Sequence, residues 1–168
     1  MSQREGRHRQ PLYDAQQRAR RDATAWTLVQ GILAPLQFLV FLVSLALVLR
    51  TLATGEGAFA ANVSIVAKTG LLYAIMVTGS IWEKVVFGRY LFAPAFYWED
   101  MVSMLVLALH SAYLVALATG WIETNGLMLL ALAAYGSYAI NATQFLLKLR
   151  AARLDAGPAS RLAAEGAR

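Results

Sequence analysis

The sequence contains no cysteine, and this absence removes several classes of function at once. Without cysteine there are no disulfide frameworks, thiolate metal sites, covalent haem attachments or cysteine nucleophiles. Histidine is scarce as well, because His8 and His110 are the only two, which is too few for a multi-histidine metal site. The chain also lacks a glycine-rich phosphate loop and the short motifs of serine hydrolases and zinc proteases. These absences exclude the soluble enzyme classes that such motifs mark.

Charged residues are also scarce. They make up 15% of the 168 residues, whereas hydrophobic residues make up 58% and the mean hydropathy is +0.50. Soluble proteins carry about 25% charged residues. A chain of this length is expected to form a single domain. The composition therefore indicates one domain in which most of the surface is apolar, as in an integral membrane protein.

Long apolar stretches account for this composition. Each of the four is close to the ~20 residues that an α-helix needs to cross ~30 Å of hydrocarbon. Lipid offers no hydrogen-bond partner to a free backbone amide, so these stretches must be helical. The sequence predicts an all-α fold, an integral membrane bundle of four transmembrane helices within residues 25–150. The predicted spans are 26–49, 63–87, 101–119 and 127–147.

Basic residues predict the orientation of the bundle. Of the 15 lysines and arginines, all but Arg50 and Lys68 lie in the arm 1–24, the segment 84–89 or the tail 148–168. An excess of Lys and Arg marks the cytoplasmic side. We therefore expect both termini in the cytoplasm, a basic arm over 1–24, and a disordered tail over 151–168. Arg50 and Lys68 fall towards the opposite side, where both are expected to snorkel to the surface.

The net charge of +5 suggests nucleic acid only at first sight. Because the charges gather at the ends and in one loop, we interpret them as orientation signals and contacts to anionic lipid headgroups, with no nucleic-acid partner. The expected location is a bacterial inner membrane, either cytoplasmic or intracytoplasmic photosynthetic, crossed several times.

Polar residues recur at helical spacing within each predicted span. Side chains three, four or seven positions apart share a helix face. The polar positions are Gln30, Gln37 and Ser44; Thr69, Tyr73, Ser80 and Glu83; Glu99, Ser103, His110 and Tyr113; and Ser137, Asn141, Gln144 and Lys148. One interpretation is association of helices through hydrogen bonds. The other, favoured by the ionisable Glu83 and His110, is a pocket that opens to the cytoplasmic leaflet.

Sequence motifs also carry a family resemblance. The segments RARRDATAWTLVQGILAPLQFLVFLVSLALVLR (18–50), IWEKVVFGRYLFAPAFYWEDMVSMLVLALHSAYLVAL (81–117) and INATQFLLKLRAARL (140–154) resemble the bacteriochlorophyllide vinyl hydratase family, also called chlorophyllide a 3-vinyl hydratases. The resemblance implies addition of water to the 3-vinyl group of chlorophyllide a or a bacteriochlorophyllide. The product is the 3-(1-hydroxyethyl) derivative, formed during bacteriochlorophyll synthesis in photosynthetic bacteria. It implies no cofactor, because the magnesium belongs to the substrate.

Hydration of a vinyl group needs a proton at the terminal carbon and water at the inner carbon. Glu83, Glu99 and Asp100 are the acidic residues near the membrane that suit these roles, because desolvation favours the protonated form of a carboxyl group. Glu83 lies within a span and is our candidate for the acid, with Glu99 or Asp100 holding the water. The alternatives are complementation of a helix N-terminus by Glu99 and Asp100, and a charge pair of Glu83 with Lys84 or Arg89.

A chlorin also needs a flat apolar slot and a contact for its propionate. Trp82, Tyr97 and Trp98 offer aromatic surface in and beside the aromatic-rich loop that begins at Gly88, and Gln37 and Asn141 lie on the predicted polar faces. Lys84 and Arg89 sit where a propionate would emerge at the headgroups. His110 is a candidate ligand of the substrate magnesium, with a hydrogen bond to Gln37 or Tyr113 as the alternative.

A non-catalytic function remains open on sequence grounds alone. The same slot would serve a membrane pigment carrier or a photosystem assembly factor. Beyond chlorophyllide and lipid, the sequence leaves open whether the chain associates with itself or with other enzymes of pigment synthesis.

Overall fold

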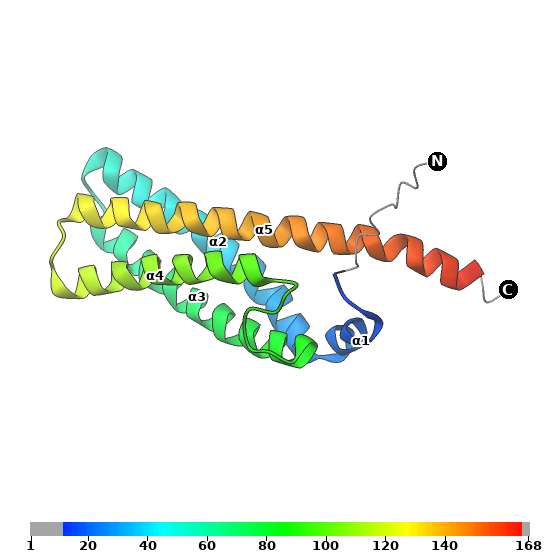
Figure 1. Cartoon of the computed structure of the whole chain (residues 1–168). Coiled ribbons are helices and arrows are strands. Elements are labelled where there is room, and N and C mark those ends of the chain that lie inside the picture. Colours follow the sequence, from blue (N-terminus) through cyan, green and yellow to red (C-terminus); the bar gives the residue numbers. More distant parts are fainter. Residues whose placement is uncertain (1–11, 166–168) are drawn as a thin grey trace, which may run out of the picture.

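Helices make up all the regular structure in the described part of the chain (Figure 1). The computed structural model describes residues 12–165, and from residue 154 onward it describes the backbone alone. The helices are α1 (Ala15–Ala23), α2 (Ala25–Thr54), α3 (Ala58–Phe87), α4 (Tyr97–Thr119) and α5 (Thr124–Glu165). Four of these, α2 to α5, are long and apolar enough to cross a membrane. The all-α fold and the four predicted spans are confirmed.

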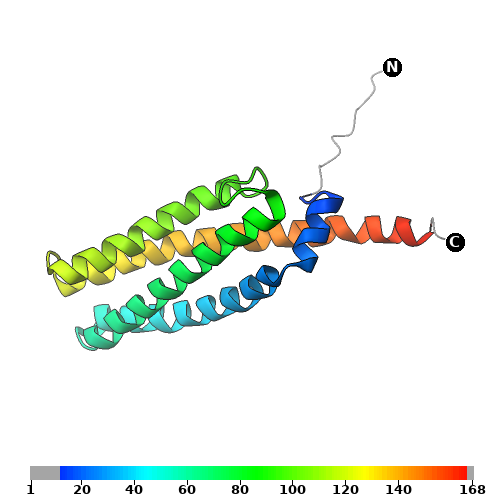
Figure 2. The same cartoon turned by 90° about the horizontal axis from the view of Figure 1, so that it is seen from below.

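The four long helices form two antiparallel hairpins. A short turn over 55–57 joins α2 to α3, and another over 120–123 joins α4 to α5. Figure 2 shows α2 running along α3 and α4 running along α5. The loop over 88–96 connects the hairpins, and α1 lies at the same end of the bundle as this loop. One end of the bundle therefore gathers the aromatic-rich loop, α1 and the far half of α5.

Helix α1 occupies the second part of the basic arm predicted over 1–24. Asp14 and Gln17 cap its first turn reciprocally, at 2.7 and 3.0 Å, which satisfies two backbone amides. Tyr13 is buried and stacks on Phe87 at a centroid distance of 5.8 Å, with the Arg21 guanidinium 4.8 Å from its ring centre. Burial raises the pKa of the Tyr13 hydroxyl. This packing fixes the short helix to the end of α3; the basic residues of segment 1–11 lie outside the described residues.

Helix α5 also extends beyond the sequence expectation. It continues past the span Thr124–Arg153 to Glu165, so residues 151–165 of the tail predicted to be disordered are helical. This segment is rich in alanine, the residue with the highest helix propensity, and continues a helix that is already nucleated inside the bundle.

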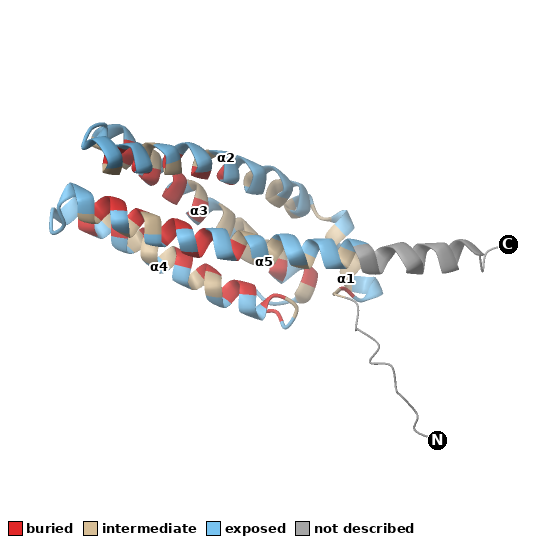
Figure 3. Cartoon of the chain, turned by 90° about the horizontal axis from the view of Figure 1, so that it is seen from above, coloured by how far each residue is buried: buried red, intermediate tan, exposed pale blue. Residues whose placement is uncertain are grey.

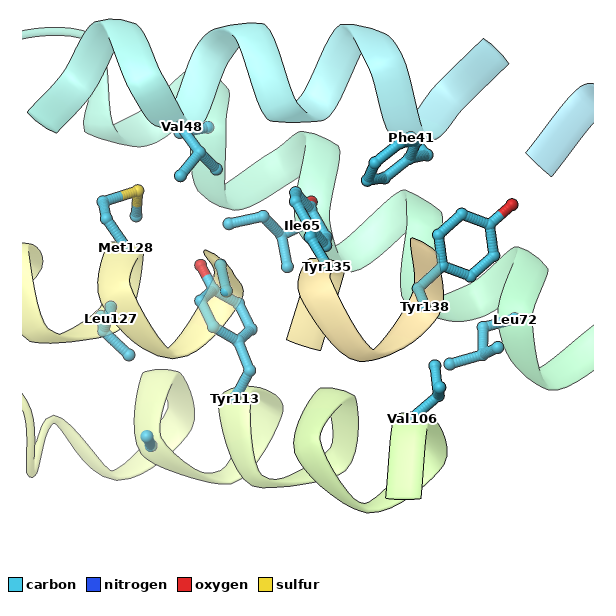
Figure 4. Packing of buried hydrophobic residues seen from close by; sticks show 13 residues of the cluster. Phe41, Val48, Ile65, Leu72, Val106, Tyr113, Leu127, Met128, Tyr135 and Tyr138 are labelled. Carbon is cyan, nitrogen blue, oxygen red and sulfur yellow. The ribbon is translucent and has the colours of Figure 1, made fainter. Parts of the chain in front are cut away.

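Apolar side chains line both the interior and the outside of the bundle. Figure 3 shows buried residues on the faces that meet and exposed residues outside. In the interior, Phe41 of α2 contacts Tyr135 and Tyr138 of α5, at centroid distances of 5.4 and 5.0 Å (Figure 4). The exposed outer face carries large apolar residues such as Leu39 and Val43. An outer surface of this kind suits contact with lipid, and the chain is a multi-pass membrane protein.

Candidate active site

Three carboxyl groups come together where α3 ends and α4 begins. Glu83 lies just before the last turn of α3, and Glu99 and Asp100 lie in the first turn of α4. All three are buried. The carboxyl groups of Glu83 and Asp100 lie side by side, close enough to share a hydrogen bond when one of them carries a proton. The structure thus places the predicted acid and one of its two predicted partners in direct contact.

The loop over 88–96 closes over this pair of carboxyl groups. The backbone N–H of Phe92 donates to Asp100 Oδ2 at 2.7 Å, and that of Ala93 donates to Glu83 Oε2 at 3.3 Å. Phe92 is the one non-glycine residue with positive φ, 59°, among the described residues. Such a conformation is costly for a bulky residue and persists where the surroundings hold it. The two carboxyl groups are what hold it here, since they accept the loop amides.

Glu99 has different partners. Its Oε2 lies 2.5 Å from Lys148 Nζ, and Lys148 also donates to the carbonyl oxygen of Ala95. The backbone carbonyl of Glu99 accepts from Asn141 Nδ2 at 2.8 Å and from Ser103 Oγ at 2.8 Å. These contacts join α4 to α5 and leave the Glu99 carboxylate in an ion pair, unlike the pair formed by Glu83 and Asp100.

The alternatives raised for the carboxyl groups can be compared with this geometry. Glu99 and Asp100 do occupy the first turn of α4, where negative charge complements the helix dipole. Within the described residues Glu83 forms no salt bridge, and Lys84 instead donates to the carbonyl of Gly88 at 3.0 Å. A role in the helix dipole therefore fits Glu99 and Asp100, whereas a charge pair does not describe Glu83.

The predicted substrate-binding residues divide into two groups. Lys84 and Arg89 are exposed beside the loop, and the Lys84 ammonium lies 5.3 Å from the ring centre of Tyr90. Tyr97 and Trp98 are also exposed, on the outer face of α4. Trp82 is half-buried, donates to Thr27 Oγ1 at 2.9 Å, and packs against Phe87 and Phe96. The aromatic residues therefore lie partly inside this end of the bundle and partly on its surface.

A second polar cluster lies deeper in the bundle. Lys68 of α3 is completely buried, and its Nζ is 2.9 Å from His110 Nε2 of α4. His110 Nδ1 is 2.8 Å from the carbonyl oxygen of Val106. The Lys68 ammonium lies 4.1 Å from the ring centre of Tyr138 and 5.2 Å from that of Tyr135. The prediction that Lys68 snorkels to the opposite surface is wrong.

The sequence did contain a signal for this burial. Lys68 lies three residues after Ile65 and four before Leu72, and both of these are buried, so all three share the inward face of α3. The expectation of snorkelling follows from the depth of Lys68 in the span, and depth does not indicate which face of the helix a residue occupies. Neither predicted alternative for His110 is formed, because its partners are Lys68 and Val106 while Tyr113 donates to Asn62 Oδ1 at 2.7 Å.

Gln37 and Asn141 sit at different depths. Asn141 belongs to the carboxyl cluster through its bond to the Glu99 carbonyl. Gln37 is buried on α2, one turn from Phe41, and its Nε2 has no hydrogen-bond partner. A buried amide donor without a partner is costly, so Gln37 is an unsatisfied group in the interior.

Comparisons with known proteins point to one family. The sequence model of a family described as 2-vinyl bacteriochlorophyllide hydratase matches residues 13–151. A protein of Cereibacter sphaeroides named 2-vinyl bacteriochlorophyllide hydratase is 70% identical over 145 residues, which cover 86% of this chain and 89% of that protein. A protein of the same name from Rhodobacter capsulatus is 68% identical over 148 residues, covering 88% and 86% of the two chains. No solved structure shows significant similarity to the chain.

Proposed function

Because the chain belongs to the family of 2-vinyl bacteriochlorophyllide hydratases, we propose that it adds water to the 3-vinyl group of chlorophyllide a or a bacteriochlorophyllide. The product is the 3-(1-hydroxyethyl) derivative. The vinyl group numbered 3 in one scheme for the macrocycle is numbered 2 in the other. The chain is a hydratase of bacteriochlorophyll synthesis, and the family and activity predicted from the sequence are confirmed. The identity of more than two thirds over most of the chain carries this conclusion.

The carboxyl pair supports an acid–base mechanism. We assign Glu83 as the general acid that transfers its proton to the terminal vinyl carbon. The resulting cation at the inner carbon is delocalised over the macrocycle. Water then bonds to the inner carbon through its oxygen and gives up a proton, so that the balance is one water added and no net change in the protein. The hydrogen bond between Glu83 and Asp100 provides the route by which Glu83 regains its proton.

Asp100 is the better candidate of the two for holding the water. Glu99 Oε2 is engaged by Lys148, whereas Asp100 is already hydrogen-bonded to the acid that must be reprotonated. An acceptor next to the acid can take the proton that water releases and return it across one hydrogen bond. Glu99 then contributes a fixed negative charge close to the developing cation.

The other predicted substrate-binding residues surround the carboxyl cluster or lie deeper in the bundle, and we propose a contact for each. Trp82 lies inside this end of the bundle and offers a ring face to the macrocycle, and Tyr97 and Trp98 extend the aromatic surface outward. Lys84 and Arg89 are exposed cations that attract the anionic substrate to the loop. Asn141 and Gln37 supply hydrogen bonds from α5 and α2. His110 as the ligand of the substrate magnesium stays a prediction, because its Nε2 faces Lys68.

The membrane location and orientation belong to the same proposal. Photosynthetic pigment synthesis and a chain with an excess of Lys and Arg at one end support insertion into a bacterial inner membrane with both termini in the cytoplasm. In this orientation the carboxyl cluster lies near the cytoplasmic surface, where water and protons are available. The turns over 55–57 and 120–123 face the opposite side.

Turnover by the isolated protein tests the proposal. Nanodiscs that contain only this chain are given chlorophyllide a in water enriched in oxygen-18. Loss of the conjugated vinyl group shifts the red absorption band to shorter wavelength, and mass spectrometry finds one labelled oxygen in the product. Binding of chlorophyllide with neither change would contradict the hydratase and support a pigment carrier or an assembly factor.

A further inference from the structure

Polar pairs line the seam between α3 and α4. From the turn at 55–57 towards the loop at 88–96 they are Asn62 with Tyr113, Lys68 with His110, Tyr73 with Ser111, and Glu83 with Asp100. Hydrogen bonds also join other helix pairs, for example Ser44 of α2 with Tyr135 of α5 and Lys148 of α5 with Glu99 of α4. When a polar ligand supplies equivalent hydrogen-bond partners, a helix interface closed by hydrogen bonds can open with little net cost in free energy. A polar ligand cannot replace the contacts of an apolar interface in this way. The α3–α4 seam is therefore a place where a polar ligand can exchange hydrogen bonds with the protein.

Along this seam, Lys68 is a buried basic side chain without a negatively charged partner. It lies ten residues from Ala58, about 15 Å in from the end of α3, and its side chain has no exposed surface. Its neighbours are a histidine and aromatic rings, which offer a lone pair and ring faces but no negative charge. Within residues 12–153, the two salt bridges join Arg21 to Asp22 and Lys148 to Glu99. Lys68 thus places a basic amine inside the bundle without an acidic partner in this part of the chain.

Gln37 adds an independent indication. Its buried Nε2 has no partner, and it lies one helical turn from Phe41, whose ring centre is 5.9 Å from Lys68 Nζ. Residues four apart share a helix face, so the free donor of Gln37 and the Lys68 site are on the same side of α2. The amine of Lys68 and the unpartnered amide of Gln37 are therefore two buried donors that can bind oxygen atoms of a ligand.

We propose that Lys68 binds the propionate carboxylate of the chlorin substrate inside the bundle, with the macrocycle inserted between α3 and α4. The inference rests on the proposed hydratase function, because the substrate supplies the carboxylate. A carboxylate beside Lys68 would supply the negative charge that stabilises the ammonium form of this buried amine. The other oxygen substituents of the macrocycle provide an acceptor for Gln37.

The dimensions of the seam agree with this placement. The vinyl group and the propionate are substituents of adjacent pyrrole rings, and an extended propionate directs its carboxylate away from the vinyl group. Along α4, His110 is ten residues from Asp100, which is about 15 Å at the helical rise. A chlorin whose carboxylate meets Lys68 therefore extends towards the Glu83–Asp100 pair with its vinyl group.

The exchange of partners has one consequence for His110. When the carboxylate takes the Lys68 ammonium, His110 Nε2 loses its present partner, and its lone pair becomes free to face the substrate magnesium. In this arrangement the exposed cations Lys84 and Arg89 attract the anionic substrate before it binds. Lys68 contacts the substrate carboxylate once it is bound. The two sets of cations serve successive steps rather than the same contact.

Binding of an acid and its ester tests the role of Lys68. The probes are an analogue of chlorophyllide a whose vinyl group is reduced to ethyl, which cannot be hydrated, and the propionate methyl ester of that analogue. Both are titrated into nanodiscs that contain the wild-type protein, Lys68→Met or Arg50→Met, with chlorin fluorescence as the readout. Arg50 is the matched control, because it is an exposed cation within a span and outside the site.

The expected result is a selective loss. Breaking a buried charge pair costs a factor of roughly 30 or more in affinity, so the preference for acid over ester should fall by that factor in Lys68→Met and stay near the wild-type value in Arg50→Met. Partitioning of the ester into lipid affects all three proteins alike and cancels in this comparison. A preference that survives in Lys68→Met, or that is absent from the wild type, overturns the proposal.

Two further measurements keep the result decisive. If Lys68→Met does not insert, the wild type alone is tested by thermal unfolding: at equal occupancy the acid must raise the Tm more than the ester, and an equal rise overturns the site. Hydration of chlorophyllide a is assayed in the same discs. If the protein binds the acid selectively but does not hydrate chlorophyllide a, the proposed hydratase function is refuted and the carboxylate site at Lys68 is retained. If it hydrates chlorophyllide a but its preference for the acid does not depend on Lys68, only the carboxylate site is refuted.

Discussion

Replacing Glu83 by glutamine separates a catalytic role from a structural one. The glutamine carbonyl can still accept the Ala93 N–H, and its amide can donate to Asp100, so both contacts of the native side chain are kept. What the variant loses is a transferable proton. Because general acid catalysis contributes ~10²–10⁴-fold, the rate of hydration should fall by that factor while folding and binding persist.

Glu99→Gln provides the structural comparison. Glu99 pairs with Lys148, and its loss leaves a half-buried ammonium with a weaker partner. A hydrogen bond to a charged group is worth about 1.5–3 kcal/mol, so Glu99→Gln should lower stability by about that amount, whereas Glu83→Gln should change it little. Asp100→Asn keeps the acceptor for the Phe92 N–H and tests the water-holding role.

The assay is the initial rate of the absorption shift in nanodiscs, with Tm measured on the same preparations. If Glu83→Gln stays active while Asp100→Asn or Glu99→Gln is silent, the roles we assign to the three carboxyl groups are exchanged. If all three variants stay active, the proton comes from water or from Tyr97, and the carboxyl cluster only holds the loop in place.

Three other predictions concern topology, capture and packing. With no native cysteine, Glu56→Cys and Thr124→Cys should react with an impermeant maleimide from the periplasm, and Ala19→Cys only from the cytoplasm; the reverse pattern would overturn the orientation. Replacing Lys84 and Arg89 by methionine should raise KM more than it lowers kcat, because exposed cations aid association rather than the chemical step, and a fall in kcat at constant KM would contradict that role. Tyr113→Phe removes the hydrogen bond to Asn62 and should destabilise the bundle by ~0.6 kcal/mol, as measured by reversible unfolding in detergent, with hydration unchanged.

Helix content and span number follow from the sequence because the bilayer imposes them. An apolar run of about 20 residues has no other way to satisfy its backbone amides in lipid. The structure lengthens each span instead of moving it; α4, for example, begins at Tyr97 rather than Met101. Apolarity alone marks the hydrocarbon, whereas a helix continues into the headgroup region with interfacial residues such as Tyr97 and Trp98. The short α1 escaped prediction because a nine-residue polar helix is marginal alone and depends on the packing of Tyr13 against Phe87.

The site was partly predictable for a related reason. Periodicity identified the inward faces, and hence Glu83, Glu99, His110 and Asn141, because residues on one face of a helix must meet the same neighbours. It did not identify their partners. That Glu83 contacts Asp100, that Glu99 is held by Lys148, and that Lys68 faces His110 depends on how α3, α4 and α5 are rotated and staggered against one another.

The sequence by itself determined that the protein lies in a membrane, how many times it crosses, and to which family and reaction it belongs. The length of hydrophobic stretches and extended motifs can be identified from the order of the residues alone. The tertiary structure decided which charges are compensated. The sequence around a lysine in an apolar span does not show whether its side chain snorkels to the surface or points into the bundle, since this depends on which face of the helix is covered by neighbouring helices. Only the packed bundle shows Lys68 turned inward, fully buried and beside His110. Only the folded loop over 88–96 brings the amides of Phe92 and Ala93 onto two carboxyl groups that come from different helices.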